Sequence, residues 1–286
     1  IGILPMAGVQ QTRITVLVDN EIQPQLGLMA EHGFCVLVER QDIRFLFDTG
    51  QGPALDHNAR ALGISLAPLD FLVLSHGHYD HTGGLLAVVK KNPGLRIVAH
   101  PDALEPHLAR EDEHTPARNI GMPYPMEELE SFGALFDLQN DFRELAPGVW
   151  FSGEVPLEFD SKVDKRLVVH EHDRLVPDPM RDDVSLLLDT PSGSVILLGC
   201  AHAGVENIMA HLCGKRSVTK VMAVLGGTHL GVFDSATTEK AIDVFEKYEV
   251  RCLGTSHCTG VEPNARLRAH FGTRFRPASA GAVFDF

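Results

Sequence analysis

Three histidines and one aspartate lie within six residues, at the end of the short apolar run 69–77. Side chains two residues apart in an extended segment point the same way, so His76 and His78 can hold one cation together. Asp80 and His81 lie on the turn that follows and face a second position. Imidazole with carboxylate favours zinc, iron(II) or manganese over calcium or magnesium. The motif therefore predicts a fold that ends a strand at a metal centre.

A similar local pattern occurs at two other places in the chain. The stretches VILLGCAHAGVEN and RCLGTSHCTGVEP each end an apolar run at a histidine, His202 or His257, and pass through glycine into a helical pattern. If these strands pack side by side, their ends converge on one edge. We assign His202 to the cation of His76 and His78, and His257 to the cation of Asp80 and His81. Two such cations would acidify a water lying between them, which would be the nucleophile.

The spacing of apolar residues predicts strands that alternate with helices after a β-rich start. We expect one domain over residues 1–286, built as two similar β/α halves. The segment 102–148 is the least periodic part, and we expect a long loop with a helical turn that either covers the site or is a surface excursion. The expected strands are 12–20, 34–40, 43–50, 69–77, 95–101, 148–155, a hairpin over 184–202, 220–230, 250–258 and 280–286, and the expected helices are 52–64, 82–92, 204–214, 235–249 and 261–272.

Glycines follow the three histidine turns and permit a close approach of the backbone. The helices that begin nearby offer free N–H groups and a partial positive charge. We therefore expect an anion-binding edge and a small anionic substrate carrying a phosphate, pyrophosphate or carboxylate. The expected backbone donors are Gly83, Gly84, Gly204 and Gly260.

Composition limits the partners of the chain. A formal charge of −13 argues against nucleic acid, which selects a basic face, and the sequence contains no apolar run long enough for a membrane span. The five cysteines form no CxxC pair, and no basic, apolar leader is present, so we expect reduced thiols and a cytoplasmic location. Self-association of the chain is compatible with the sequence.

The stretches SHGHYDHTGG and FLFDTG are similar to signatures of the metallo-β-lactamase fold superfamily. This resemblance covers nearly the whole chain. It implies an αβ/βα four-layer sandwich, an α/β fold in which two mixed sheets are flanked by helices, with a dinuclear metal centre at one edge. It also implies that Asp48 orients the metal site rather than binding a cation.

Within the superfamily, GCAHAG, GGTHL and HCTG resemble a narrower group, the 7,8-dihydropterin-6-methyl-4-(β-D-ribofuranosyl)-aminobenzene-5'-phosphate synthases. The archaeal members of this group join a pterin pyrophosphate to an aryl-amine ribose phosphate. We therefore expect a dinuclear metal-dependent hydrolase or transferase that acts on a small phosphorylated, pterin-related substrate. Two divalent ions are expected, with zinc favoured over manganese or iron.

The chain departs from the superfamily pattern at one important position. Many members have Gly-Asp where this chain has Gly199-Cys200, and that aspartate bridges the metals. Either Cys200 is a ligand or His202 takes over, and we favour a buried thiol beside the site. Asp182 and Asp183 are either replacement ligands or a solvated acidic pair. His229 either reaches the substrate or belongs to the core edge. We place Asp80 and His229 in the catalytic set.

Other functions compete with this hypothesis. A lactonase or thioesterase is one, although such members usually carry the aspartate that is absent at Cys200. A non-catalytic metal-binding or ligand-sensing module is another, and a redox di-iron centre is a third. His170 and His172 repeat the metal spacing, but they lack the strand–glycine–helix context and are interpreted as loop or edge-strand residues.

Overall fold

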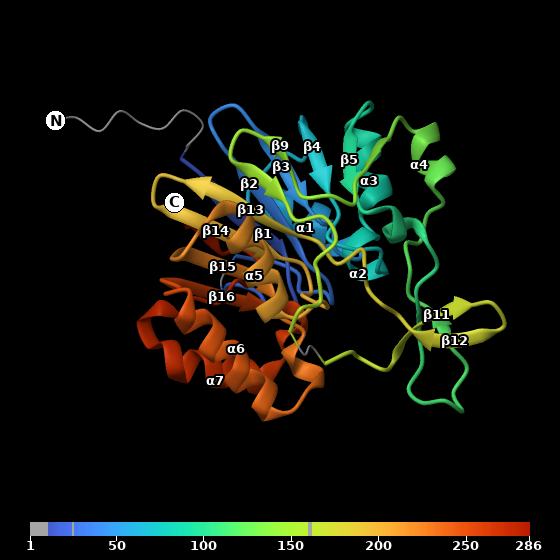
Figure 1. The fold of residues 1–286 in the computed structure, drawn as a ribbon. Coiled ribbons are helices and arrows are strands. Elements are labelled where there is room, and N and C mark those ends of the chain that lie inside the picture. Colours follow the sequence, from blue (N-terminus) through green and yellow to red (C-terminus); the bar gives the residue numbers. More distant parts are fainter. Residues whose placement is uncertain (1–10, 25, 160–161) are drawn as a thin grey trace.

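Two β-sheets form the centre of the computed structural model, which describes residues 11–24, 26–159 and 162–286 (Figure 1). The first sheet has the strand order β17-β1-β2-β3-β4-β5-β8. Its first strands are antiparallel, whereas β3, β4, β5 and β8 run parallel. The strands are β1 (Arg13–Val18), β2 (Cys35–Glu39), β3 (Arg44–Phe47), β4 (Phe71–Val73), β5 (Arg96–Ala99), β8 (Leu135–Leu138) and β17 (Val283–Asp285).

The second sheet has the order β16-β15-β14-β13-β10-β9. Strands β14, β15 and β16 are parallel, so their carboxyl ends lie at one edge of the sheet. The β13–β14 pair is the hairpin expected over 184–202. The strands are β9 (Arg143–Ala146), β10 (Val149–Phe151), β13 (Ser185–Thr190), β14 (Gly193–Leu198), β15 (Val221–Gly227) and β16 (Cys252–Ser256).

Alternation along the strands divides apolar residues between two faces of each sheet. Val36 and Val38 of β2 face the core between the sheets, together with Leu186 and Leu188 of β13. Leu37 of β2 faces the other way, toward the outer helices. Both faces of the central strands are therefore buried, which explains their nearly continuous apolar sequence.

Helices cover the outer face of each sheet. On the first sheet lie α1 (Pro53–Ala61), α3 (Leu85–Lys91) and α4 (Met126–Ser131), and on the second lie α5 (Val205–Arg216), α6 (Ser235–Lys247) and α7 (Val261–Phe271) (Figure 1). The layers run helix, sheet, sheet, helix, so the predicted αβ/βα sandwich is confirmed. Among the described residues, no helix is long and apolar enough to span a membrane.

A third, smaller sheet lies outside the sandwich, and we call it the small sheet. It has the order β12-β11-β6-β7, and the β11–β12 hairpin projects from the body of the molecule (Figure 1). His170 and His172 belong to this exposed hairpin. The strands are β6 (Leu108–Ala109), β7 (Arg118–Asn119), β11 (Leu167–Glu171) and β12 (Arg174–Pro177).

The segment 102–148 differs from the long loop that the sequence predicts. Besides α4, it supplies β6 and β7 to the small sheet, β8 to the first central sheet and β9 to the second. Backbone pairing with neighbouring strands, rather than an apolar pattern of its own, gives this segment its structure. A single domain over 1–286 stays a prediction.

Candidate metal centre

The predicted ligands come together where strands of both sheets end. In parallel sheets, functional side chains gather at the carboxyl ends of the strands. In this structure those ends of the two sheets lie next to each other. The rings of His76 and His202 are 4.9 Å apart between centroids, and those of His78 and His202 are 5.1 Å apart. Nε2 of His81 lies 3.2 Å from Nε2 of His257. The structure therefore brings the predicted histidines together in one cluster, in which the rings of His76 and His81 are also close, at 4.2 Å between centroids. Their division between two cations stays a prediction.

The backbone at these strand ends is strained. Asp48, Ala201, His229 and His257 follow β3, β14, β15 and β16, and their φ angles of 63°, 58°, 51° and 49° lie in the left-handed region. Each such residue costs about 1–3 kcal/mol and persists only where the surrounding structure enforces it, and such residues cluster at functional sites. A Cβ at Gly199 would meet the side chain of Ser75, so the two sheets approach closely at this point.

The first group of candidate ligands is a set of three imidazoles. His76 Nε2 lies 3.0 Å from His78 Nδ1, and the ring of His202 packs against both. Nε2 of His78 and Nε2 of His202 are buried without a hydrogen-bond partner among the described residues. Burial lowers the pKa of all three rings, that of His78 to about 4. They are therefore neutral at neutral pH, the form that binds a cation.

The second group combines a carboxylate with two imidazoles. Oδ2 of Asp80 lies 3.2 Å from His257 Nε2 and 3.7 Å from His81 Nε2. Burial opposes its ionisation, yet the pKa of Asp80 stays well below its ordinary value because these histidines surround it. Burial alone would lower the pKa of His81, but Asp48 and Asp80 raise it to about 9. A divalent cation would replace that proton as the partner of Asp80.

Cys200 lies between the two groups. Its sulfur is 3.2 Å from His81 Nε2 and belongs both to the set with His76 and His202 and to the set with His81 and His257. The ligand-type atoms of each set lie within 4.8 Å of one another. This position is compatible with both alternatives left by the sequence, a ligand and a buried thiol beside the site, so both stay predictions. Unpartnered buried nitrogens, an enclosed carboxylate and a central sulfur together fit two divalent cations.

Asp48 holds His81 in orientation. Its carboxylate accepts hydrogen bonds from the backbone N–H and the hydroxyl of Ser75, both at 2.7 Å. It also lies 2.7 Å from Nδ1 of His81. Because Nδ1 is taken by Asp48, Nε2 of His81 faces the second group. This is the orienting position that the resemblance implies.

Asp182 and Asp183 support the ligand-bearing loops, so the solvated acidic pair, one of the two alternatives left by the sequence, is wrong. Both are buried rather than solvated. One oxygen of each carboxylate is buried without a hydrogen-bond partner among the described residues, and a ligand role stays a prediction. Asp182 accepts a hydrogen bond of 2.8 Å from the backbone of Gly77, between two ligands, and Asp183 accepts one of 2.9 Å from Ala203, next to His202. Burial raises the pKa of Asp183 to about 7.

Sequence reasoning missed two further histidines that border the site. His107 Nδ1 lies 2.8 Å from Asp178, its Nε2 lies 3.3 Å from Asp182, and its ring packs against His78. His32 Nε2 lies 3.2 Å from Asp80 Oδ2. His107 belongs to the aperiodic segment and His32 to the connection after β1, so no local pattern marks either residue.

His229 lies beside the first group. Its ring centroid is 4.2 Å from that of His202, and its Nε2 is 3.2 Å from Asp164 Oδ2. Its Nδ1 is buried without a partner among the described residues. Cys258, which the sequence did not single out, accepts a hydrogen bond of 3.3 Å from the backbone of His229. His229 therefore combines a core-edge position with access to the site.

The expected backbone anion site is wrong for three of its four glycines. The amides of Gly83, Gly84 and Gly204 donate to backbone carbonyls at 2.8, 3.3 and 3.0 Å, so they are not free for an anion. A Cβ at Gly83 or Gly84 would meet the backbone of the segment after β3, which explains why glycine is needed there. Gly260 does line the cavity over the site.

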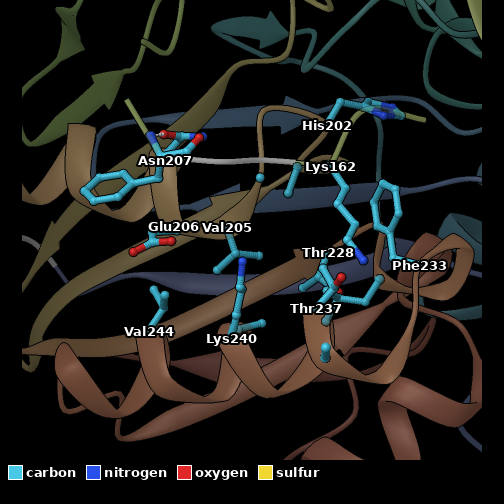
Figure 2. A pocket seen from close by; sticks show the side chains of 16 residues that line it. Lys162, His202, Val205, Glu206, Asn207, Thr228, Phe233, Thr237, Lys240 and Val244 are labelled. Carbon is cyan, nitrogen blue, oxygen red and sulfur yellow. Dashed lines mark hydrogen bonds between the residues drawn. The ribbon is translucent and has the colours of Figure 1, made fainter. Parts of the chain in front are cut away.

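A cavity of about 530 Å³ covers the two ligand groups. His32, His229 and Cys258 line it along with the candidate ligands. A second cavity of about 220 Å³ lies between α5 and α6 and reaches His202. Figure 2 shows Val205, Val244 and Phe233 on its walls, beside polar side chains that include Lys162, Glu206 and Lys240.

The chain matches the model of the metallo-beta-lactamase superfamily over residues 29–250. It belongs to the metallo-β-lactamase superfamily. The synthase of Methanocaldococcus jannaschii named 7,8-dihydropterin-6-methyl-4-(beta-D-ribofuranosyl)-aminobenzene-5'-phosphate synthase is 29% identical over 288 residues, 97% of this chain and 98% of the synthase. An uncharacterized protein of the same organism is 30% identical over 257 residues, 89% of this chain and 93% of its own length. The predicted superfamily is therefore confirmed, and the predicted resemblance to the synthases extends over nearly the whole chain.

Solved structures show the same fold. Tm1679, described as a metal-dependent hydrolase of the beta-lactamase superfamily, is 29% identical with a TM-score of 0.80, over 96% of this chain and 99% of Tm1679. Zn²⁺-bound PqqB from Methylobacterium extorquens is 13% identical with a TM-score of 0.55, over 96% of this chain and all of PqqB. At that identity PqqB supports the metallo-β-lactamase fold alone.

Proposed function

We propose that this metallo-β-lactamase-fold chain is a metal-dependent hydrolase or transferase acting on a small phosphorylated substrate. The observation that carries the proposal is the convergence of two ligand groups on the floor of one cavity. One cation would be held by His76, His78 and His202, and a second by Asp80, His81 and His257, with Cys200 between them. Zinc is favoured by this donor set, ahead of manganese and iron.

Bound at these positions, two divalent ions supply Lewis acidity that activates water and stabilises a departing oxyanion. The residues of the chain have separate tasks around that chemistry. Asp48 fixes the proton of His81 on Nδ1 and so keeps Nε2 available. Asp164 holds His229 through Nε2, and Nδ1 has no hydrogen-bond partner among the described residues. Burial acts to lower the pKa of His229, but Asp164 and Cys258 raise it to about 9, so His229 can serve as a proton donor.

The similarity to the synthase supports a phosphorylated, pterin-related substrate. The name of that relative describes a dihydropterin joined to a ribofuranosyl-aminobenzene phosphate. The cavity between α5 and α6 supports the same proposal, because its walls carry the apolar side chains of Val205 and Val244 and the ring of Phe233, against which a flat ring system can pack (Figure 2). The reacting group would then lie over the metal centre.

A metal analysis joined to a substrate panel tests this proposal. Purified protein loaded with zinc, manganese or iron is freed of excess ion, and its metal content is measured by mass spectrometry. Phosphate monoesters, pyrophosphates and lactones are then tested with and without a chelator. We expect two metal ions per chain and chelator-sensitive turnover of phosphorylated compounds. Turnover of lactones alone, or less than one bound ion per chain, contradicts the proposal.

A further inference from the structure

The small sheet forms one wall of the 530 Å³ cavity and places three arginines on it, Arg110, Arg118 and Arg166. Strand pairing brings them together. Ala109 of β6 pairs with Arg118 of β7 and with Leu167 of β11, and the backbone of Arg110 donates to the carbonyl of Arg166 at 2.9 Å. All three arginines therefore line the same cavity, although they come from segments far apart in the sequence.

These arginines differ in what they already bind. Arg166 makes two hydrogen bonds to the carboxylate of Asp164, at 3.0 and 2.7 Å, and so belongs to the support of His229. Arg110 and Arg118 form no ion pair with any carboxylate in the described part of the chain. Arg110 acts on Asp112 only through longer-range charge. Two arginines thus line the cavity with guanidinium groups that no described residue engages, in a chain of net charge −13.

We propose that Arg110 and Arg118 bind a phosphate group of the substrate in the cavity that the candidate metal ligands also line. This inference rests on the proposed function and specifies its substrate: a phosphomonoester whose phosphate is not the group that reacts. A guanidinium presents paired N–H donors that match phosphate oxygens. One guanidinium balances the single charge of a carboxylate, whereas two balance the double charge of a phosphate dianion. The arginines take the role that backbone amides at Gly83, Gly84 and Gly204 cannot fill.

The site predicts that ligand size decides productive binding. A compound must reach from the small sheet to the ligand groups, so a ribose phosphate fits the requirement whereas inorganic phosphate fills only one end. A compound that lacks a phosphate would have to obtain all of its affinity from the metal centre. The phosphate contacts are expected to act on affinity rather than on the chemical step, because they lie away from the reacting atoms.

The test measures binding of ribose 5-phosphate and of ribose to metal-loaded protein by titration calorimetry. The variants are Arg110→Ala, Arg118→Ala and the double variant. Arg174→Ala is the matched control, because Arg174 lies on β12 of the same small sheet, is exposed and does not line the cavity. We expect about a tenfold weaker affinity for ribose 5-phosphate for each single variant, more for the double variant, and less than twofold for Arg174→Ala. Ribose should bind weakly to all of them.

The proposal is overturned if the double variant binds ribose 5-phosphate within twofold of the unaltered protein, if Arg174→Ala weakens binding as much, or if the unaltered protein does not bind it. Circular dichroism of each variant checks that the small sheet is still folded. Failure here is distinguishable from failure of the proposed function. If binding depends on the arginines but no phosphorylated compound is turned over, the proposed function is wrong. If phosphorylated compounds are turned over with a KM that does not change in the arginine variants, only this inference is wrong.

Discussion

Asp48 determines which nitrogen of His81 faces the second ligand group, and this makes a first prediction. In Asp48→Asn one carboxylate oxygen becomes an NH₂ group, which donates and cannot accept, so at least one of the hydrogen bonds from Ser75 and His81 is lost. We expect zinc affinity at one of the two positions to fall by about 10–100-fold. Competition with a chromophoric chelator measures both affinities.

Asp56→Asn is the matched control for that experiment. Asp56 pairs with Lys91 on the surface and lies away from the site. Its substitution should leave both zinc affinities unchanged. Equal affinities for Asp48→Asn and the unaltered protein would show that Asp48 does not act through His81.

A second prediction concerns His107 and the pH dependence of stability. Burial alone would lower its pKa, but Asp178 and Asp182 raise it to about 10, against an ordinary value of 6.5. A raised pKa means that the folded protein holds the proton more tightly than the unfolded chain. The contribution is therefore fully present below pH 6.5 and is lost as the pH rises toward 10. Urea unfolding of metal-loaded protein across this range should show the loss, and His107→Gln should remove it.

His211→Gln controls for the loss of an imidazole. The ring of His211 contacts the carbonyl of Ser152 at 2.9 Å rather than a carboxylate. This variant should keep the pH dependence of the unaltered protein between pH 6.5 and 10. If His107→Gln has that same dependence, the ion pair does not contribute to stability.

The limits of sequence reasoning at the residue scale have a physical origin. His76 and His78 are two residues apart on one extended segment, and His202 and His257 each end an apolar strand, so local rules place them. His107 reaches the site because β6 pairs with β11, a contact between residues more than fifty positions apart. The sequence suggested that glycine amides near the site are free to bind an anion. Only the folded backbone shows that three of them donate to backbone carbonyls.

At the scale of elements, burial explains which strands could be predicted. β2 is almost wholly buried, β14 is buried over its last four residues, and both carry apolar runs, whereas β8 and β9 contain no buried residue. Their sequences therefore lack the apolar pattern on which strand prediction depends. The strands of the small sheet in 102–148 are two residues long, too short for any periodicity.

A third prediction belongs to the connection between α2 (Tyr79–Thr82) and α3. Gly83 has ordinary helical backbone angles, but a Cβ there would meet the backbone of Gln51. Gly83→Ala should therefore destabilise the fold by about 1–3 kcal/mol through overpacking. It should also weaken zinc binding, because the displaced helix carries Asp80 and His81. Thermal unfolding and zinc titration measure the two effects.

Gly214→Ala tests whether the effect at Gly83 comes from the close approach. Gly214 lies in α5, is exposed, and a Cβ there meets nothing within 4 Å. Alanine is a better helix former than glycine, so this variant should be neutral or more stable by up to about 1 kcal/mol. Two destabilised variants of similar size would mean that the packing against Gln51 is not the cause.

At the scale of the whole molecule, the metal centre joins the two sheets. His76 and His78 follow β4 of the first sheet, whereas His202 and His257 follow β14 and β16 of the second. The apolar core holds the sheets together over most of their area, but at the site edge the contact consists of imidazoles, a carboxylate and a thiol. Without cations, several buried polar atoms there lack partners, which costs stability.

The last prediction follows from this arrangement. Zinc that binds only the folded protein adds stability that grows with free zinc, by about 2.7 kcal/mol at one hundred times its dissociation constant. The melting temperature should therefore rise with buffered zinc and fall when a chelator is added. His257→Ala should reduce the slope by removing one position, whereas His170→Ala, on the exposed hairpin, should leave it unchanged. If the melting temperature of the unaltered protein does not change with the zinc concentration, the two sheets are held together without metal ions. The convergence of ligands at their edge then serves another purpose.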